Sequence, residues 1–495
     1  MNSMPANATI LLTPDEMAAA DKAAAASGLS SFGLMLRAGQ AVAATALAHW
    51  PGAIRYAVLC GPGKNGGDGY VAARALADAG ATVAVFALGD PAALKGDARQ
   101  AFDLCPVTVQ PIGDYQPQPG DLVIDGLFGA GLSRSVPPVA AEVIDAASKA
   151  GLPVLAIYLP SGVCGRRGQV LGAAFQASRT ITFMARKPGH LLMPGRTLAG
   201  HVDVFDIGIP ARILTAAAGE IRVNDPSVWQ QALPVLGSET HKFRRGHLVV
   251  FSGSASHTGA ARLSAAAGLG AGAGLVTVAA PADAMPVQAT ALTAVMLRQV
   301  DDADQLVDWM SAGKLSAFVI GPGFGIGEKA RRYVEAVADK PVVVDADAIT
   351  SFSEAPEALF AAFAQGPTRL VLTPHEGEFG RLFPDLAGDE TLGKVEKAAA
   401  AAKRAHAAIV YKGADTVIAA PDGRVLINEN APPWLATAGS GDVLAGIIGA
   451  LLAQGVPAFE AAAAGVYLHG AAAGRAGIGM TAEDLVRHIA PPTAL

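Results

Sequence analysis

The stretch NENAPPWLATAGSGDVLAGIIGALLAQG, residues 428–455, indicates a loop that leads into a buried helix. Its centre is Gly439-Ser440-Gly441-Asp442, and an unbroken apolar segment follows from Val443 to Ala453. A helix that is apolar all round belongs in a protein core. Because Ser440 is a small polar residue just before the apolar segment, we expect it to be the N-cap.

The same four residues favour an anion site at the start of the helix. Gly439 and Gly441 let a ligand approach the backbone closely, and the first N–H groups of a helix attract anions such as phosphate. Asp442 is then a candidate base that takes a proton from a hydroxyl group attacking the phosphate. The alternative is that Ser440 or Asp442 only caps the helix, because G-x-G-D is a short pattern.

Length and composition restrict the class of protein. A chain of 495 residues is too long for one ordinary core, so two or three domains are expected. Hydrophobic residues make up 51% and charged residues 16%, which is typical of globular proteins. The formal charge of −6, without a basic block, argues against a nucleic-acid partner.

The sparse cysteines and the missing targeting signals predict a cytoplasmic protein. Three cysteines, Cys60, Cys105 and Cys164, do not suit a disulfide framework or a zinc site. The first residues lack the basic and apolar regions of a signal peptide. Because no apolar run is long enough to span a bilayer, we expect no membrane partner.

Buried strands alternate with Ala-rich helices in the first half, which indicates a doubly wound parallel sheet. The strand at 56–60 runs into the Gly-rich stretch GPGKNGGDG at 61–69, and a helix is expected to follow. A strand, a Gly-rich turn and a helix form a Rossmann-like unit. Further strands are expected within 81–88, 121–129 and 152–162.

Polar residues at these strand ends suggest a ligand site, since ligands of such sheets bind beyond the carboxyl ends of the strands. They are Asn65, Asp68, Asp125 and Ser161. The oxygen atoms of Asn65, Asp125 and Ser161 would suit a hard cation. Each of these residues alone is equally typical of an ordinary turn.

The second half repeats the pattern of a strand that ends in glycine or polar residues. The ends carry a Gly/Ser loop after Phe251, a Gly-rich loop after Ile320, then Asp345 and Asp347, His375 and Glu378, and Lys412. If these ends meet in one cleft with Asp442, they form a phosphoryl-transfer site for a nucleotide and a hydroxyl substrate. The Walker pattern of P-loop enzymes is missing from the sequence. Taken singly, His375, Lys412 and the aspartates also suit purely structural roles.

The two halves are predicted to be separate α/β domains. Two prolines, a polar cluster and a change of pattern mark a linker at about 216–239. We therefore expect domains at 1–218 and 226–495, each a three-layer αβα sandwich, the first Rossmann-like.

The first half resembles the NAD(P)H-hydrate epimerase family. The motifs KNGGDG, VIDGLFGAGLSRSV, LPSGV and KPGHLLMPGRTLAGHVDVFDIGIP carry the resemblance, which covers about residues 13 to 213. The resemblance implies that Asn65, Asp125 and Ser161 bind K⁺. It also implies that the hydrate is contacted by position 158 and by two loops, namely Asn65, Gly66, Gly67 and Asp68, and Gly129, Ala130, Gly131, Leu132, Ser133, Arg134 and Ser135.

Two residues depart from that family. Lys64 stands where the family has an asparagine, and Tyr158 stands where it has the aspartate expected to be its acid/base group. The ordinary pKa of a phenol is far above neutrality, so a tyrosine does not replace a carboxylate base. We therefore expect the fold to be retained, and the domain either to be an impaired epimerase or to have become a scaffold.

The second half resembles the ADP-dependent NAD(P)H-hydrate dehydratase family, of the ribokinase-like superfamily. The motifs HKFRRGHLVVFSGS, HTGAARL, GAGLVTV, GPGFG, DADAI, TPHEGEF, YKGADTV and the opening stretch occur in order over about residues 226 to 490. The resemblance implies a ribokinase-like fold, ADP as phosphate donor and Mg²⁺. The S-hydrate of NAD(P)H would be phosphorylated on its 6-hydroxyl group and then lose phosphate, and NAD(P)H and AMP would be released.

The same resemblance assigns residues to roles. Asp442 would be the base and a substrate contact, and Glu378 would help to hold Mg²⁺. The nucleotide would be bound by Lys412, Gly413, Ala414, Asp415, Thr416, Ser440 and Gly441, and the hydrate by Ala260, Gly323 and His375.

The sequence leaves two other interpretations open. A ribokinase-like kinase for a small alcohol would use the same fold and the same Asp442, and it would release a stable phosphorylated product. In the second interpretation, the first half is a non-catalytic module that binds a dinucleotide or supports oligomerisation. In either case we expect a homo-oligomer.

Overall fold

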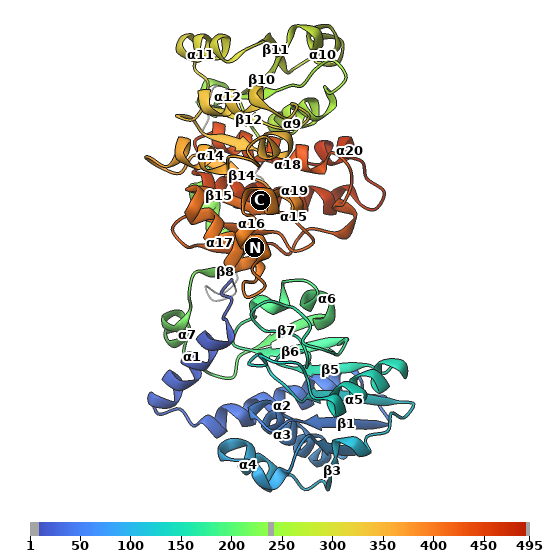
Figure 1. Cartoon of the computed structure of the whole chain (residues 1–495). Helices are drawn as coiled ribbons and strands as arrows, with labels where there is room; N and C mark the ends of the chain where they lie inside the picture. Colours follow the sequence, from blue (N-terminus) through green and yellow to red (C-terminus); the bar gives the residue numbers. More distant parts are fainter. Residues whose placement is uncertain (1–8, 236–241, 492–495) are drawn as a thin grey trace. The chain divides into compact units, whose positions relative to one another are not determined.

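The computed structural model describes residues 9–235 and 242–491, so residues 236–239 of the expected linker lie outside the described residues. The chain divides into two compact units, Met1–Ile221 and Arg222–Leu495. Each unit contains one large sheet (Figure 1). Within the described part of the chain, no helix is long and apolar enough to cross a membrane.

The sheet of the first unit has seven strands in the order β3-β2-β1-β4-β5-β6-β7, all parallel. This order is Rossmann-like, with its switch point between β1 and β4. The strands are β1 Arg55–Cys60, β2 Val83–Ala87, β3 Val109–Pro111, β4 Asp121–Gly126, β5 Val154–Ile157, β6 Arg179–Phe183 and β7 His201–Phe205.

Alternate residues of these strands face two separate cores, because successive side chains of a strand point to opposite faces. Val58 and Ile124 lie in one apolar cluster, with residues of α1, α2, α3 and α4. Ala57 and Val123 lie in the other, with residues of α5. The helices are α1 Pro14–Ala26, α2 Ser31–His49, α3 Lys64–Asp78, α4 Gly96–Asp103, α5 Pro138–Lys149, α6 Gly195–Ala199 and α7 Ala211–Ala217. The predicted three-layer arrangement is confirmed.

The start of α3 differs from the prediction, which placed the helix after the whole Gly-rich stretch. The helix begins at Lys64, so Asn65 and Asp68 lie in its first turns rather than in the preceding loop. Close packing explains this, since a Cβ atom at Gly66 would lie 1.9 Å from the Gly61 carbonyl oxygen. Glycine is a poor helix former, but here it is the residue that lets the helix approach β1.

The second unit is built on a ten-stranded sheet in the order β11-β10-β9-β12-β13-β14-β15-β16-β17-β8. The strands from β11 to β15 pair in parallel, and β15, β16 and β17 pair antiparallel. The strands are β8 Ile221–Val223, β9 His247–Phe251, β10 Leu275–Ala280, β11 Met296–Gln299, β12 Ala317–Ile320, β13 Val342–Val344, β14 Leu370–Leu372, β15 Ala407–Tyr411, β16 Val417–Ala419 and β17 Val425–Ile427.

Helices cover both faces of this sheet. Alternate strand residues such as Val250 and Val319 share one apolar core with α9, α18, α19 and α20. On the other face, Phe251 contacts Tyr333 of α12, and Tyr411 stacks on Phe379 of α15 with ring centroids 4.0 Å apart. The helices of this unit are α8 Pro226–Trp229, α9 Gly259–Gly270, α10 Met285–Ala291, α11 Ala303–Ala312, α12 Glu328–Ala336, α13 Ala346–Ser351, α14 Pro356–Phe363, α15 Glu376–Leu382, α16 Pro384–Gly388, α17 Lys394–Ala405, α18 Ser440–Ala453, α19 Ala458–Ala476 and α20 Ala482–Arg487.

Candidate active sites

The stretch that opens α18 turns at Gly439, whose φ of 84° is in the left-handed region. Glycine adopts this conformation without the penalty that a Cβ atom brings. Gly439 is the N-cap and Ser440 is the first residue of the helix, so the prediction of a Ser440 cap is wrong by one position. The predicted apolar segment Val443–Ala453 is confirmed as buried throughout. The N-terminus of a long helix therefore opens directly at Ser440, Gly441 and Asp442.

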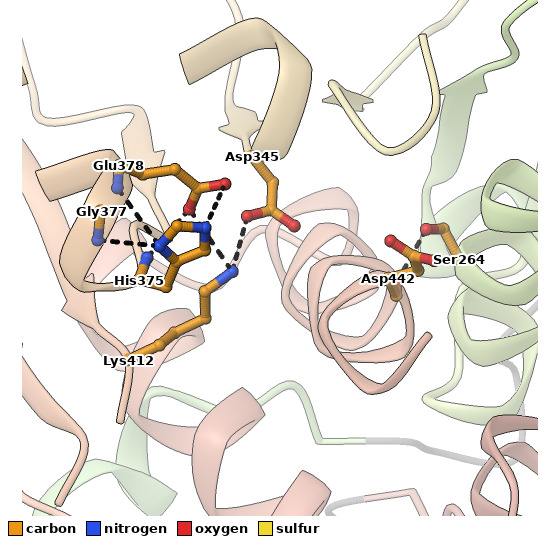
Figure 2. Close-up of polar contacts among 7 residues, drawn as sticks. All are labelled: Ser264, Asp345, His375, Gly377, Glu378, Lys412 and Asp442. Atoms are coloured by element: carbon orange, nitrogen blue, oxygen red, sulfur yellow. Dashed lines mark hydrogen bonds and ion pairs between the residues drawn. The ribbon is translucent and has the colours of Figure 1, made fainter. Parts of the chain in front are cut away.

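Asp442 is held in a partly buried position at this helix end. The Ser264 hydroxyl of α9 donates a hydrogen bond of 2.7 Å to the Asp442 backbone carbonyl (Figure 2). Burial raises the pKa of the Asp442 carboxyl to about 6, with Asp345 also raising it and Lys412 opposing. A carboxylate with this pKa suits proton transfer near neutral pH.

Lys412 supplies a positive charge beside the opening of α18. Its Nζ atom donates to Asp345 Oδ1 at 2.9 Å and lies 4.0 Å from Glu378 Oε2 (Figure 2). Burial lowers the pKa of Lys412, but the carboxylates of Asp345, Glu378 and Asp442 together outweigh burial, and the pKa is raised. A Cβ atom at Gly441 would lie 3.7 Å from Lys412 Nζ, so the ammonium group and the helix end face the same point.

His375 and Glu378 cap α15 reciprocally. His375 Nδ1 accepts from the backbone N–H groups of Gly377 and Glu378 at 3.0 and 3.2 Å, and Glu378 Oε2 accepts from the His375 N–H group at 2.9 Å (Figure 2). The His375 side chain keeps 56% of its surface exposed, and its Nε2 atom lies 3.4 Å from Glu378 Oε1. His375 therefore caps the helix and still exposes more than half of its side chain.

Two other residues assigned to the hydrate lie side by side. Gly323 has a φ of 60°, and a Cβ atom there would lie 3.3 Å from the Ala260 Cβ atom. Ala260 is one turn before Ser264 on α9, so it lies on the face that approaches Asp442. Ala260 and Gly323 are thus neighbours, and Ala260 lies one turn from the residue that contacts Asp442.

The segment assigned to the nucleotide, residues 412–416, follows β15 directly. Asp415 is buried, and its carboxylate accepts from Lys394 Nζ at 2.7 Å. Lys394 Nζ also donates to the Lys412 carbonyl at 3.3 Å. Sequence reasoning missed Lys394 because it lies in an Ala-rich helix, where a lysine is usually a solvated charge.

A second residue that sequence reasoning missed is His469, in the middle of α19. Its side chain is buried and bonds to the Ser440 backbone, and burial lowers its pKa to about 4. No motif marks it, because its role depends on the packing of α19 against α18.

The first unit contains a cavity of about 910 Å³ at the carboxyl ends of its strands. Its lining includes the predicted substrate residues Asn65, Asp68, Tyr158 and the loop from Gly129 to Arg134. Gly66, Gly67 and Ser135 are not among the lining residues. Gly67 instead faces Met35, since a Cβ atom there would lie 2.6 Å from the Met35 methyl group.

Asp125 and Ser161 are joined in the buried centre of this unit. Ser161 donates to the Asp125 carboxylate from its hydroxyl at 2.6 Å and from its backbone N–H at 2.7 Å. Burial raises the pKa of Asp125 to about 6, and no basic side chain is among the groups that shift it. Asn65 is also buried, and a Cβ atom at Gly129 would lie 3.6 Å from Asn65 Oδ1. A buried carboxylate beside serine and asparagine oxygen atoms fits a hard cation.

Tyr158 has an unusual backbone and an unusual neighbour. Its φ of 72° is left-handed, and its carbonyl contacts His190 Nε2 at 2.9 Å. Its ring centroid is 4.0 Å from Lys187 Nζ. Burial raises the pKa of the phenol well above its usual range, and Asp21 and Asp68 raise it further. The phenol is therefore neutral at physiological pH.

Comparison with known proteins identifies the family of this chain. The family model of NAD(P)H-hydrate dehydratase matches residues 248–491, and that of the YjeF-related protein N-terminus matches residues 31–189. Bifunctional NAD(P)H-hydrate repair enzymes of Thermofilum pendens and Escherichia coli are 35% and 33% identical to this chain, over 93% and 92% of it and 91% and 88% of their own length. The chain belongs to the bifunctional NAD(P)H-hydrate repair enzymes.

A repair enzyme of this family has both halves found here, an epimerase domain and a dehydratase domain. Among solved structures, the ADP/ATP-dependent NAD(P)H-hydrate dehydratase of Bacillus subtilis, crystallised with ATP and Mg²⁺, is 28% identical. It covers 54% of this chain and 95% of its own, with a TM-score of 0.47. The family models and the two repair enzymes confirm the predictions of family and enzyme class.

Proposed function

We propose that the second unit of this repair enzyme dehydrates the S-hydrate of NADH or NADPH, with ADP as phosphate donor. The observation that carries the proposal is the position of Asp442, a carboxylate with a raised pKa at the open N-terminus of α18 beside Lys412. Asp442 would take the proton of the 6-hydroxyl group as that oxygen attacks the β-phosphate of ADP. Phosphate then leaves C6 of the nicotinamide ring and a proton leaves C5, so that the C5=C6 double bond forms, and NAD(P)H and AMP are released.

Each neighbouring group has a part in this reaction. The N–H groups at Ser440 and Gly441 would stabilise negative charge on the transferred phosphoryl group. Lys412 would attract the phosphates, with Asp345 fixing its direction. Ala260, Gly323 and His375 would contact the hydrate, and residues 413–416 the nucleotide. A bound Mg²⁺ ion would neutralise phosphate charge, and Glu378 would help to hold it.

For the first unit, we propose that the cavity binds the hydrate and interconverts its R and S forms slowly. The cavity supports binding by its size and by its lining of Asn65, Asp68 and the Gly129–Arg134 loop. We expect a slow rate because Tyr158 provides no carboxylate at the position of the family's expected acid/base group. Asn65, Asp125 and Ser161 would hold K⁺, whose positive charge would neutralise the buried Asp125 and order the loop next to it.

A mixture of R- and S-NADHX with ADP and Mg²⁺ tests both proposals at once, followed by NADH absorbance and by AMP release. We expect rapid recovery of the S fraction, with one AMP for each NADH, and slow recovery of the R fraction. Accumulation of a stable phosphorylated product instead of NADH would show a ribokinase-like kinase. Fast recovery of both fractions would show that Tyr158 does not limit epimerisation.

A further inference from the structure

Asp21 brings a carboxylate into the cavity of the first unit from α1, far from the motifs of the strand ends. Met17, Ala20 and Ala24 are the buried residues of this helix. Asp21 lies on the same side, four residues after Met17, and it lines the cavity together with Asn65, Asp68 and Tyr158. Its side chain keeps 33% of its surface exposed, so a ligand in the cavity can reach it.

Asp21 interacts with both residues that depart from the epimerase family, Lys64 and Tyr158. Lys64 Nζ lies 3.8 Å from Asp21 Oδ2, and Lys64 itself is 73% exposed. Tyr158 lines the same cavity, and the charge of Asp21 acts on its phenol. The asparagine of the family would leave Asp21 without this ammonium partner, and the aspartate of the family would place a second carboxylate where Tyr158 is neutral. Lys64 and Tyr158 thus both interact electrostatically with Asp21.

Asp68 is less suited to exchange protons with a ligand, although it lines the same cavity. It is only 9% exposed, and burial followed by the charge of Asp21 raises its pKa well above the usual range. Burial therefore disfavours the charged form of the Asp68 carboxyl group. Burial also raises the pKa of Asp21, but the ammonium group of Lys64 opposes the rise. Of the carboxyl groups of Asp21 and Asp68, that of Asp21 is the more exposed and the one with an ammonium partner.

We propose that Asp21 is the catalytic acid/base residue of the first unit and exchanges a proton with the 6-hydroxyl group of the hydrate. This rests on the proposed hydrate-binding function of the cavity. The 6-carbon bears both the hydroxyl group and the ring nitrogen, so it is a hemiaminal. Asp21 takes the hydroxyl proton, a C=O bond forms, and the C6–N1 bond breaks with its electron pair going to N1. The protonated Asp21 then returns that proton to N1.

Epimerisation is completed by the reverse steps. Rotation about the C5–C6 bond presents the other face of the aldehyde to N1. Asp21 removes the proton from N1 as the C6–N1 bond re-forms, and it returns the proton to the oxygen. No oxidant, reductant or further reactant is consumed. Tyr158 acts here as a neutral hydrogen-bond group, and Lys64 acts as a positioning residue that favours the ionised form of Asp21.

The test compares Asp21→Asn, Asp21→Glu and Tyr158→Asp/Asp21→Asn with the parent chain on R-NADHX, with ADP and Mg²⁺ present. Dehydration of S-NADHX by the same samples reports folding and the function of the second unit. We expect Asp21→Asn to lower kcat for the R-hydrate about a hundredfold or to the spontaneous rate, with KM within a few-fold. Asp21→Glu should keep part of the rate, and Tyr158→Asp should rescue Asp21→Asn by supplying the family carboxylate. Asp78→Asn, on an exposed site of α3, is the matched control.

The possible results separate this proposal from the dehydratase proposal. An Asp21→Asn chain that converts R-NADHX at the parental rate would overturn the role of Asp21. So would a loss of conversion confined to Asp97→Asn, which removes another carboxylate lining the cavity. A parent chain without R-conversion above the spontaneous rate would also overturn it, while normal turnover of S-NADHX would leave the dehydratase proposal intact.

Discussion

Lys187 Nζ lies 4.0 Å from the ring centroid of Tyr158, and Lys187 has no exposed surface. The ammonium group donates to the Thr182 hydroxyl and to the Phe183 and Ala185 carbonyls at 3.1, 3.2 and 2.6 Å. Burial lowers the pKa of Lys187 to about 7, and Asp21 partly opposes this. A carboxylate at position 158 would face this buried amine. With tyrosine at this position, the site lacks both that anionic partner for Lys187 and a base.

Restoring the family residues should raise epimerase activity. Asp at position 158 would be paired with Lys187, and aspartate accepts the left-handed backbone of this position better than tyrosine does. We therefore expect Tyr158→Asp/Lys64→Asn to convert R-NADHX at least about tenfold faster than the parent, because general bases contribute about 100-fold or more. Tyr158→Phe, which keeps the ring on Lys187 and adds no carboxylate, should show no such gain. Equal rates for the double variant and the parent would refute the account of an impaired site.

Removing the base of the second unit should stop dehydration. We expect Asp442→Asn to lower kcat for S-NADHX at least about a hundredfold, since a neutral amide takes no proton from the 6-hydroxyl group. Asp422→Asn removes a carboxylate that is half exposed and paired with Arg424 in the turn between β16 and β17, and it should leave kcat unchanged. NADH recovery with AMP release is the measurement. Near-normal turnover of Asp442→Asn would exclude Asp442 as the base.

Dehydration should also lose rate as pH falls through about 6. Asp442 acts as a base only when ionised, and its pKa is raised to about 6, so the active form is present above this pH and lost below it. The profile of kcat/KM reports this ionisation in the free enzyme. Lys412→Met should move the midpoint upward, because Lys412 lowers the pKa of Asp442, and Asp345→Asn should move it downward. A midpoint that is the same in all three chains would assign the ionisation to another group.

The sequence was informative where chemistry follows a local pattern. The strand ends that carry Asp345, His375 and Lys412 could be predicted, because parallel strands bring their carboxyl ends to one edge of a sheet. The start of α3 at Lys64 and the cap of α18 at Gly439 could not be predicted, because both depend on close backbone approaches that only the packed structure reveals. The role argued for Asp21 was hidden for the same reason: its neighbours Lys64 and Tyr158 lie 43 and 137 positions along the chain.

The contact between α9 and α18 gives a prediction about stability. Gly446 lies in the middle of α18, and a Cβ atom there would lie 2.1 Å from the Ser264 carbonyl oxygen. Alanine normally stabilises a helix relative to glycine by about 0.5–1 kcal/mol. At Gly446 the added methyl group meets backbone, which cannot rotate away, so we expect Gly446→Ala to lower the free energy of unfolding by about 1–3 kcal/mol.

Gly474→Ala is the matched control for this prediction. Gly474 lies in α19, and a Cβ atom there would meet no atom within 4 Å, so the ordinary helix preference should make this variant about 0.5–1 kcal/mol more stable. Denaturant unfolding followed by far-UV circular dichroism measures both changes. Gly446→Ala should also lower dehydration, because pushing α9 away from α18 breaks the bond from the Ser264 hydroxyl to the Asp442 carbonyl. If both alanines were stabilising, the close approach of the two helices at Gly446 would be wrong, and with it the placement of Asp442 by α9.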